Sequence, residues 1–390
     1  MSFNIALSGL NAVNSSLSQI SNNIANSGTV GFKSGAANFA SAYVGGKVGG
    51  VYLNSISQSI GTGGTINATG RGLDAAINGR GFFVVASTDG SLVYTRAGQF
   101  TVDKDGYLVD AANRRVQGYS TDSNGAVDSL KVPTAGMAAV SSTQVDYAGN
   151  MSADWVAPTA AFDQNDATSY NGVQVTSVYD SLGRQHTLSQ YFVRGTGNEV
   201  TVHYALDGAL TGATGDLQFD TNGRLATPAA PMSVSIGTPD GAEPLALDID
   251  YAGTTFFGGD FSTATNMADG NAPGTLVNVS LTADGSVQLE YSNNLTLIAG
   301  QLALATFPAE DVLTAVDGTG WKPNAETGDP IYGRAGTGLI GDIATASLET
   351  SNVDMATELV NLMSAQQNYQ ANSKVLTSES EMIKTLMQSL

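Results

Sequence analysis

Apolar side chains recur with the spacing of a helix seam at both ends of the chain. Near the start they alternate steps of four and three residues, and near the end they recur every seven residues, as in a coiled coil. We predict helices over about the first 24 residues and over residues 352–390. The predicted assembly seam comprises Ala6, Leu10, Val13, Leu17, Ile20, Ile24, Leu359, Leu362, Tyr369, Leu376, Ile383 and Leu390. A chain with seams at both ends is expected to assemble through them.

The second predicted helix contains two interleaved heptad series. Leu362, Tyr369, Leu376, Ile383 and Leu390 form the first series. We place the other at Leu359, Gln366, Ser373, Ser380 and Met387. The last glycine is Gly341 and the last proline Pro330, so no helix breaker interrupts this region.

Between the two stripes, short runs of Val, Tyr, Phe, Thr and Leu alternate with turn signals. Strands are expected at residues 82–86, 92–96, 100–102 and 107–109, and hairpin turns at 180–183, 220–223 and 284–285. Turn signals about every ten residues favour sandwiches or barrels over βαβ units. The predicted fold class is therefore mainly β with α-helical coiled-coil termini, in a nested arrangement of several domains.

Composition places the domain boundaries. The terminal helical domain is predicted at 1–27 plus 352–390, and a Gly-, Ser- and Asn-rich extended connector at 28–70 plus 346–351. An inner β domain is predicted at 71–145 plus 284–345. An inserted outer β domain, where proline joins glycine and aspartate, is predicted at 146–283.

Charge narrows the possible partners. The net charge of −19 argues against nucleic acid or an anionic membrane surface as a partner, because both require clustered Lys and Arg. No stretch has the roughly 18 apolar residues of a membrane span. No charged residue precedes Lys33, and the polar face of the first helix shows mainly Ser and Asn. We expect this face to pack against neighbours or to line something neutral. The alternative is that this terminal helix frays in the monomer. The two interpretations are compatible if the ends of the chain become ordered only on assembly.

Residues suited to catalysis or metal binding are sparse. The chain has no cysteine, so it forms no disulfide or thiolate metal site. His186 and His203 lie near predicted strands without companion ligands and are expected to be structural. The glycines at 61, 63 and 64 fit a connector better than a dinucleotide site. Residues 103–106 and 122–125 fit hairpin turns better than calcium loops. We predict no enzyme activity, no metal and no cofactor.

Several motifs resemble those of bacterial flagellar rod and hook proteins. SNNIAN at residues 21–26 followed by GFK at 31–33 is similar to their N-terminal signature, and LETSNVD at 348–354 with QQNYQAN at 366–372 to their C-terminal helix. NGRGFF at 78–83 with TRAGQF at 95–100 is similar to their first β domain. The motif residues carried over are Asn22, Asn23, Asn26, Gly31, Phe32, Lys33, Ser351, Asn352, Val353, Asp354, Gln367, Tyr369, Gln370 and Asn372.

A motif in the middle of the chain distinguishes the hook members of this family from the rod members. VYDSLG at 178–183, leading to His186, resembles the outer domain of the hook members, which the shorter rod members lack. The sequence departs from the family pattern at Asn294, where glycine is usual, and at residues 27–28 of the N-terminal loop. The lysine-to-cysteine-derived crosslink of some lineages cannot form without cysteine.

The resemblance implies a structural subunit that polymerises helically into a curved, flexible tube, a universal joint that transmits torque from rod to filament and carries an export channel. It implies an extracellular place in the flagellum, reached without a cleaved signal peptide. The implied partners are further copies of the chain, the hook cap, the distal rod protein, the hook–filament junction protein, the hook-length ruler and the export apparatus. Two alternatives remain: another axial protein of the rod or junction, or a secreted β-rich adhesin or hydrolase.

Overall fold

The computed structural model describes residues 2–44, 47–121 and 125–388, and the chain divides into two compact units. The first unit comprises residues 1–134, 278–290 and 296–390. The second comprises residues 135–277 and 291–295. Among the described residues, no helix combines the length and apolar character needed to cross a membrane.

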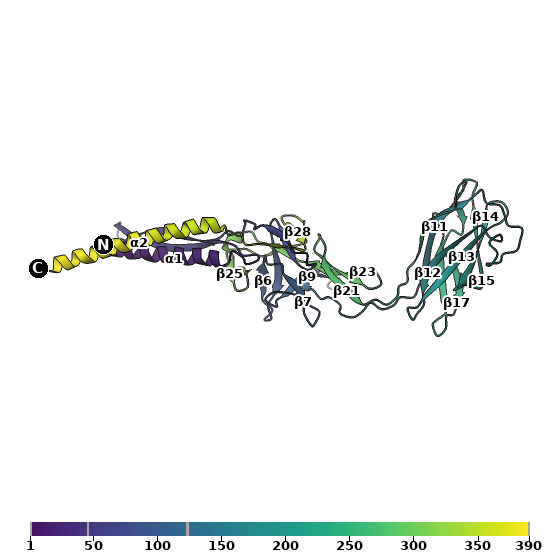
Figure 1. The fold of residues 1–390 in the computed structure, drawn as a ribbon, viewed down its shortest axis with the longest axis horizontal. Coiled ribbons are helices and arrows are strands. Elements are labelled where there is room, and N and C mark those ends of the chain that lie inside the picture. The colour runs from purple at the N-terminus through teal and green to yellow at the C-terminus, as the bar shows by residue number, and fades with distance from the viewer. Residues whose placement is uncertain (1, 45–46, 122–124, 389–390) are drawn as a thin grey trace. The chain divides into compact units, whose positions relative to one another are not determined.

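Two helices and a long hairpin make up one part of the first unit. Helix α1 (Ser2–Ala25) and helix α2 (Met355–Gln388) lie side by side, and β1 (Gly35–Val44) pairs antiparallel with β2 (Lys47–Gln58) next to them (Figure 1). The Asp354 carboxylate caps α2, because its Oδ1 accepts from the Ala356 N–H at 2.9 Å. The helix therefore begins at Met355, three residues later than predicted.

The rest of the first unit is β structure with an aromatic core. Phe82, Tyr94, Phe307 and Trp321 are buried there, and the Tyr94 and Phe307 rings meet edge to face with centroids 4.7 Å apart. The strands of its large sheet are β5 (Phe82–Ala86), β6 (Leu92–Thr95), β7 (Phe100–Val102), β8 (Leu108–Asp110), β9 (Arg115–Ser120), β10 (Val127–Ser129), β21 (Leu276–Leu281), β22 (Ser286–Tyr291), β23 (Thr296–Leu302), β24 (Leu304–Thr306), β25 (Thr314–Val316), β26 (Gly320–Lys322) and β27 (Ile331–Gly333).

Two strand pairs link the segment that leads from the β1–β2 hairpin into the large sheet, here called the β body, to the segment that leads from that sheet back to α2. Strand β3 (Ile66–Ala68) pairs with β29 (Ser347–Glu349), and β4 (Ala75–Asn78) pairs with β28 (Asp342–Thr345), both antiparallel. A 3₁₀ turn at Glu310–Val312 completes the elements of this unit. Segments nearly 280 residues apart in sequence are thus held together by backbone hydrogen bonds.

The second unit is a sandwich of two sheets around one core. One sheet has the order β12 (Gly172–Tyr179), β13 (Gln185–Arg194), β14 (Glu199–Leu206), β15 (Ala209–Phe219) and β16 (Leu225–Thr227). The other contains β17 (Met232–Gly237), β18 (Leu245–Asp250), β11 (Gln144–Ser152), β19 (Thr255–Phe257) and β20 (Ser262–Ala268). Buried side chains from both sheets, such as Tyr147 and Phe192, pack together.

Aspartate shapes the tight turns in both units. In the predicted turn at residues 180–183, the Asp180 Oδ1 accepts the backbone N–H groups of Leu182 and Arg184, each at 2.9 Å. Asp220 makes the same pair of contacts with Asn222 and Arg224. The predicted hairpins at 180–183 and 220–223 are therefore confirmed. The loop proposed at 103–106 is likewise a turn between β7 and β8, whereas residues 122–124 lie outside the described part of the chain.

Segment boundaries differ from those expected from composition. The second unit begins at Ala135 instead of residue 146, because the backbones of Met137 and Val140 bridge to Gly274 and Asn271. The predicted connector contains the 10- and 12-residue strands of the β1–β2 hairpin. Its glycine content suggested a linker, but its Val, Tyr and Ile residues form a ladder. Strand β8 begins one residue later than predicted and β6 ends one residue earlier.

Candidate assembly site at the junction of the terminal helices

Helices α1 and α2 run antiparallel in one continuous register. A Cβ atom at Gly9 would lie 3.1 Å from the Asn372 side chain, and Asn23 donates to Glu358 at 2.7 Å. Fourteen residues separate the two contacts on each helix, so the register is unbroken between them. The absent side chain of Gly9 allows the polar Asn372 to approach the backbone of α1.

The predicted seam of α1 lies on the side that the structure covers. Ala6 and Ile20 are buried, and Leu10, Val13, Leu17 and Ile24 are partly buried. This face packs against α2 and the β1–β2 hairpin, where the Ser8 Oγ accepts the Val51 N–H at 3.1 Å. Within one chain these positions therefore form a packed face. Their part in contacts between copies stays a prediction.

The predicted seam of α2 is less covered. Leu362 and Leu376 are partly buried, whereas Leu359, Tyr369 and Ile383 are exposed, and Leu390 lies outside the described residues. The side of α2 turned toward α1 carries Glu358, Leu362, Ala365, Asn372, Leu376 and Glu379.

The contact within the chain uses the series one position before Leu359, whereas the series predicted from Leu359 as an assembly seam stays a prediction. Both possible series alternate with Leu362 and Tyr369 at steps of three and four, so spacing alone does not separate them. The contact uses Ala365, which is buried, and Asn372, which lies against Gly9. The apolar Leu359 remains exposed on another face.

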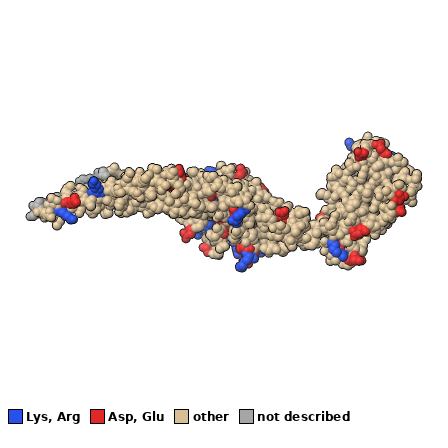
Figure 2. All heavy atoms as spheres, viewed as in Figure 1, with Lys and Arg blue, Asp and Glu red and all other residues tan. Residues whose placement is uncertain are grey.

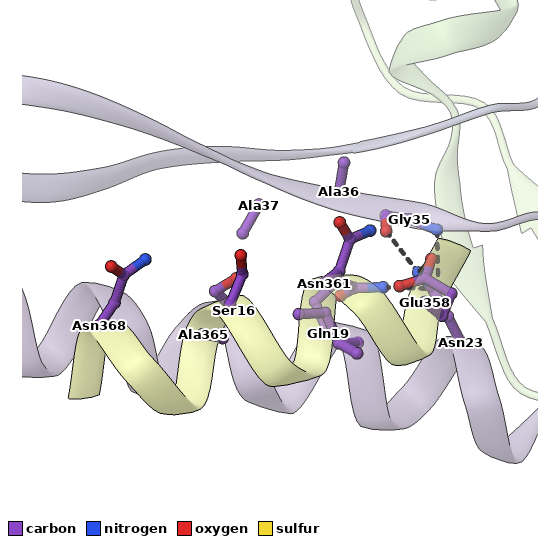
Figure 3. A pocket seen from close by; sticks show the side chains of 12 residues that line it. Ser16, Gln19, Asn23, Gly35, Ala36, Ala37, Glu358, Asn361, Ala365 and Asn368 are labelled. Atoms are coloured by element: carbon purple, nitrogen blue, oxygen red, sulfur yellow. Dashed lines mark hydrogen bonds between the residues drawn. The ribbon is translucent and has the colours of Figure 1, made fainter. Parts of the chain in front are cut away.

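Asn23 joins three elements where the helices meet the β body (Figure 3). Its Nδ2 donates to the Gly35 carbonyl at 2.8 Å and to Glu358 Oε1 at 2.7 Å. Its Oδ1 accepts the Gly35 N–H at 3.0 Å and the Gln19 amide at 3.3 Å. All four hydrogen bonds available to an asparagine amide are made, on a nearly fully buried residue. This position therefore sets the end of α1, the start of β1 and the start of α2 relative to one another.

Asn352 makes a matching connection on the C-terminal side. Its Oδ1 accepts the Ser34 N–H at 2.7 Å, and its Nδ2 donates to the Ser59 and Thr62 carbonyls, each at 3.0 Å. These bonds tie the segment before α2 to both ends of the β1–β2 hairpin. The motif asparagines at 23 and 352 thus both hydrogen-bond to backbone groups at the ends of the hairpin.

A buried charge network lies beside these asparagines. Lys33 Nζ is 2.5 Å from Glu349 Oε1, and both side chains are almost completely inaccessible to solvent. Arg96 Nη1 lies 3.3 Å from Glu349 Oε2, and its Nη2 donates to the Gly79 carbonyl at 2.8 Å. Burial lowers the pKa of Lys33, although the hydrogen bond to Glu349 opposes this shift. One carboxylate therefore contacts cations from two distant segments.

Gly31 allows this close packing. Its φ is +70°, and a Cβ atom there would lie 2.6 Å from the backbone nitrogen of Ala97. Its N–H donates to the Glu349 carbonyl at 2.8 Å, and the Lys33 Nζ also donates to the Thr62 carbonyl at 2.8 Å. The motif around Gly31, Phe32 and Lys33 thus lies directly against the strand that carries Glu349.

The remaining motif residues lie outside this network. Asn26 Nδ2 donates to Asn22 within the last turn of α1, the Ser351 Oγ accepts the Val353 N–H, and Asp354 caps α2. Gln367 and Gln370 are exposed on α2. Hydrogen bonds from Thr357 and Ala356 hold the pKa of Asp354 below its usual range. The structure therefore joins the motif residues near the junction, while Gln367 and Gln370 along α2 are open to solvent.

A polar groove of about 300 Å³ follows the junction between α1, α2 and β1. Its lining includes Ser16, Gln19, Asn361, Ser364 and Asn368 (Figure 3). Figure 2 shows that, on the face drawn, charged side chains on the helical part gather near the end of α2. Among the described residues there is no cluster of three or more His, Asp or Glu side chains able to hold a metal ion.

Sequence reasoning missed the partners of Lys33 and Asn23. The motif contained both residues, but their partners Glu349, Arg96 and Glu358 were not assigned to a site. One signal was present: Lys33 is the first charged residue, and the first acidic residue, Asp74, comes 41 positions later. A buried Lys33 therefore required a carboxylate from a distant segment.

The second unit contains a separate ionic cluster around His186. Its Nδ1 lies 2.7 Å from Asp207 Oδ2 and its Nε2 lies 3.2 Å from Asp180 Oδ2, while Arg184 also contacts Asp180. Burial opposes ionisation of the ring, but the hydrogen bonds to Asp207 and Asp180 raise its pKa. His203 instead stacks on Phe162, and burial lowers its pKa.

Comparison with known families and proteins gives a consistent result. Residues 3–33 match the family described as flagella basal body rod protein, and residues 76–153 match the flagellar hook protein FlgE/F/G D1 domain. Residues 148–271 match the flagellar basal body protein FlaE D2 domain, and residues 344–389 match the flagellar basal body rod FlgEFG protein C-terminal family.

Full-length relatives agree with these matches. The chain is 37% identical to the flagellar hook protein FlgE of Escherichia coli (strain K12) and 38% identical to that of Salmonella typhimurium, with 99% of each chain covered. The crystal structure of Helicobacter pylori flagellar hook protein FlgE2 has a similar fold, with a TM-score of 0.57 at 14% identity. That match covers 73% of this chain and 100% of the other.

Proposed function

The chain belongs to the flagellar hook protein FlgE family, and from that premise we propose a division of labour between its parts. It is a structural subunit of the flagellar hook, located outside the cell. In the proposal, α1, α2 and the β1–β2 hairpin hold copies together in a helical tube, while contacts of the second unit shift as the tube bends.

One observation carries the first half of the proposal: the helices and hairpin leave many large apolar side chains exposed. On α2 these are Met355, Leu359, Val360, Met363, Tyr369, Val375, Met382, Ile383 and Met387, and on the hairpin Phe39, Tyr43, Tyr52, Leu53 and Ile56. Exposed apolar surface of this extent is typical of an interaction site. Copies of the same chain would cover it in the tube.

The junction gives such contacts a mechanical connection to the β body. Asn23 hydrogen-bonds to Gly35 in β1, Asn352 hydrogen-bonds to the adjacent Ser34, and Lys33 pairs with Glu349 in β29. A torque applied through the helices would therefore pass to the β structure without first bending a loose linker. This is the property that a rotating joint requires.

The charge of the second unit supports the other half of the proposal. Its residues include 15 Asp or Glu and three Lys or Arg. Like charges repel, so contacts between second units of neighbouring copies would be weak and salt-dependent. Weak contacts that can exchange between bent-in and bent-out states fit a flexible tube.

Further parts of the proposal concern the channel and the partners. The uncharged Ser and Asn face of α1 suits a wall past which unfolded chains move without being held. We expect export without a cleaved signal peptide, and contacts with the hook cap, distal rod protein, hook–filament junction protein, hook-length ruler and export apparatus. We expect no enzymatic step in this role.

Polymerisation of the purified chain tests the division of labour. Leu17→Asp and Leu376→Asp place a charge in the partly buried face between the helices and should abolish tubes seen by electron microscopy. Val156→Asp on the exposed surface of the second unit is the matched control and should leave tubes intact. Replacing residues 135–277 with a short linker should leave straighter tubes. Complete loss of polymer in that deletion, with a folded first unit, would contradict the proposal.

A further inference from the structure

Helix α2 extends well beyond the start of α1. The register places Gly9 opposite Asn372, so the seven residues back to Ser2 correspond to the seven residues on to Glu379. Residues 380–388, the C-terminal overhang, therefore have no α1 residue opposite them. At about 1.5 Å per residue the overhang is about 13 Å long. Figure 1 shows the C-terminal end of α2 passing the N-terminus of α1.

The overhang continues the face that α2 turns toward α1. Leu376, Glu379 and Ile383 follow one another at steps of three and four, so Ile383 belongs to the same side of the helix. Yet Ile383 is 52% exposed, and Met382 and Met387 are 62% and 75% exposed. The apolar face that packs within the chain thus continues into the overhang, where no residue of the described part of the chain covers it.

The overhang cannot fold back onto its own chain without breaking the helix. Helix α2 is continuous to Gln388, and it contains neither glycine nor proline. Its only charges are Glu381 and Lys384, which leave the overhang without net charge. A neighbouring copy therefore meets an apolar surface with no electrostatic barrier.

A complementary apolar surface lies at the same end of the helix pair. Phe3 and Leu7 are one helical turn apart on α1 and are 40% and 43% exposed, whereas Ala6 between them is buried. No charged residue occurs on α1. This pair, the α1 tip, is an uncharged apolar surface at the same end of the helix pair as the overhang.

We propose that the C-terminal overhang of one copy packs on Phe3 and Leu7 of the next copy. This inference rests on the proposed polymer and names one of its contacts. The two surfaces differ, so each copy offers its overhang to one neighbour and its α1 tip to another. Such a heterologous contact repeats without closing a dimer and builds an open series of copies. Because both surfaces lie at one end of the helix pair, the copies stand side by side.

Cysteine crosslinking tests the contact, since the chain has no cysteine of its own. Leu7→Cys and Met387→Cys chains are purified separately, mixed, polymerised under reducing conditions and then oxidised. Tubes containing both variants should give a disulfide-linked dimer on a denaturing gel. The matched control is Ser21→Cys, which is exposed on the same face of α1 two heptads away, about 21 Å from Leu7. Mixed with Met387→Cys, it should give at least tenfold less dimer.

The outcomes separate this contact from the polymer itself. Normal tubes without the Leu7–Met387 dimer would overturn the inference and leave the proposed function standing. A dimer formed by Met387→Cys alone at equal yield would overturn it in favour of a symmetric pair. If the unaltered chain formed no tubes, that result would contradict the proposed function, and with it the contact that depends on the polymer. Loss of tubes in Leu7→Cys, with an unchanged thermal transition of the monomer and normal tubes in Ser21→Cys, would support the contact, because Leu7 is already exposed in the monomer.

Discussion

Lys33 and Glu349 lie 316 positions apart in the chain and form a buried ion pair with 2.5 Å between Nζ and Oε1. Lys33 follows the turn after α1, and Glu349 ends β29 shortly before α2. The pair therefore joins the outgoing and returning segments of the chain at the base of both helices.

Breaking this pair is expected to destabilise the first unit strongly. Glu349→Gln leaves the Lys33 ammonium and the Arg96 guanidinium buried without a countercharge, at a cost of about 3 to 5 kcal/mol in the free energy of unfolding. Urea unfolding of the monomer measures this. Lys104→Met removes an exposed pair with Asp105 and should leave the transition unchanged. Equal effects of the two variants would show that burial does not matter here.

Gly31→Ala should also destabilise the junction. The added methyl group meets the backbone of Ala97 at 2.6 Å, and a positive φ costs an L residue about 1 to 2 kcal/mol before any clash. Gly28→Ala is the matched control, since a Cβ atom there has nothing within 4 Å. The thermal midpoints of the two variants provide the comparison. A Gly31→Ala midpoint as high as that of Gly28→Ala would contradict the packing described here.

Asn23→Ala is expected to loosen the start of β1. The substitution removes four hydrogen bonds and leaves the Gly35 N–H and carbonyl without those partners, at a cost of about 1 to 3 kcal/mol. Hydrogen exchange at the Gly35 amide should accelerate accordingly. Asn22→Ala, at the exposed neighbouring position, should leave that amide protected. Unchanged protection in Asn23→Ala would mean that other contacts hold this strand.

The second unit should lose stability as pH rises through the pKa of His186. Both ring nitrogens face carboxylate oxygens, which only accept hydrogen bonds, so the arrangement is satisfied only by the protonated ring. A pKa raised above 6.5 in the folded state stabilises it fully below that value, and the contribution is lost at higher pH. His186→Gln should flatten this dependence of the unfolding transition.

His203 provides a control of opposite sign. Its lowered pKa means that it favours the folded state above pH 6.5 and that this contribution is lost as pH falls. With two histidines in the chain, proton NMR resolves both titrations directly. His186 should titrate above His203. The reverse order would refute the ionic arrangement around Asp180 and Asp207.

The sequence predicted the helices and turns better than it predicted which segments contact one another. The apolar stripe of α1 predicted a helix that ends within a residue or two of Ala25, and the Asp and Gly pairs marked real turns. On α2 the heptad pattern admitted two phases, and the contact of Asn372 with Gly9 on the other helix shows which phase faces α1 within the chain. Spacing carries no information about such packing across two helices.

The junction illustrates a second limit. Gly31 and Asn352 were recognisable as motif residues, but their roles depend on φ angles and backbone groups of segments far away in the chain. Within the predicted connector a few strand pairs were expected, but its glycine-rich composition did not give the length of the hairpin within 35–58. Local propensity cannot reveal a strand that is stabilised by packing against a helix.

Electron cryomicroscopy of the purified tube would show directly which surfaces of the terminal helices are covered by neighbouring copies. We predict that α1 and α2 of each copy contact the helices of neighbouring copies along the innermost wall, with Leu359, Met363 and Ile383 covered. Assembly through the terminal helices would be contradicted by a tube in which these side chains remain exposed to solvent and copies touch only through their β structure.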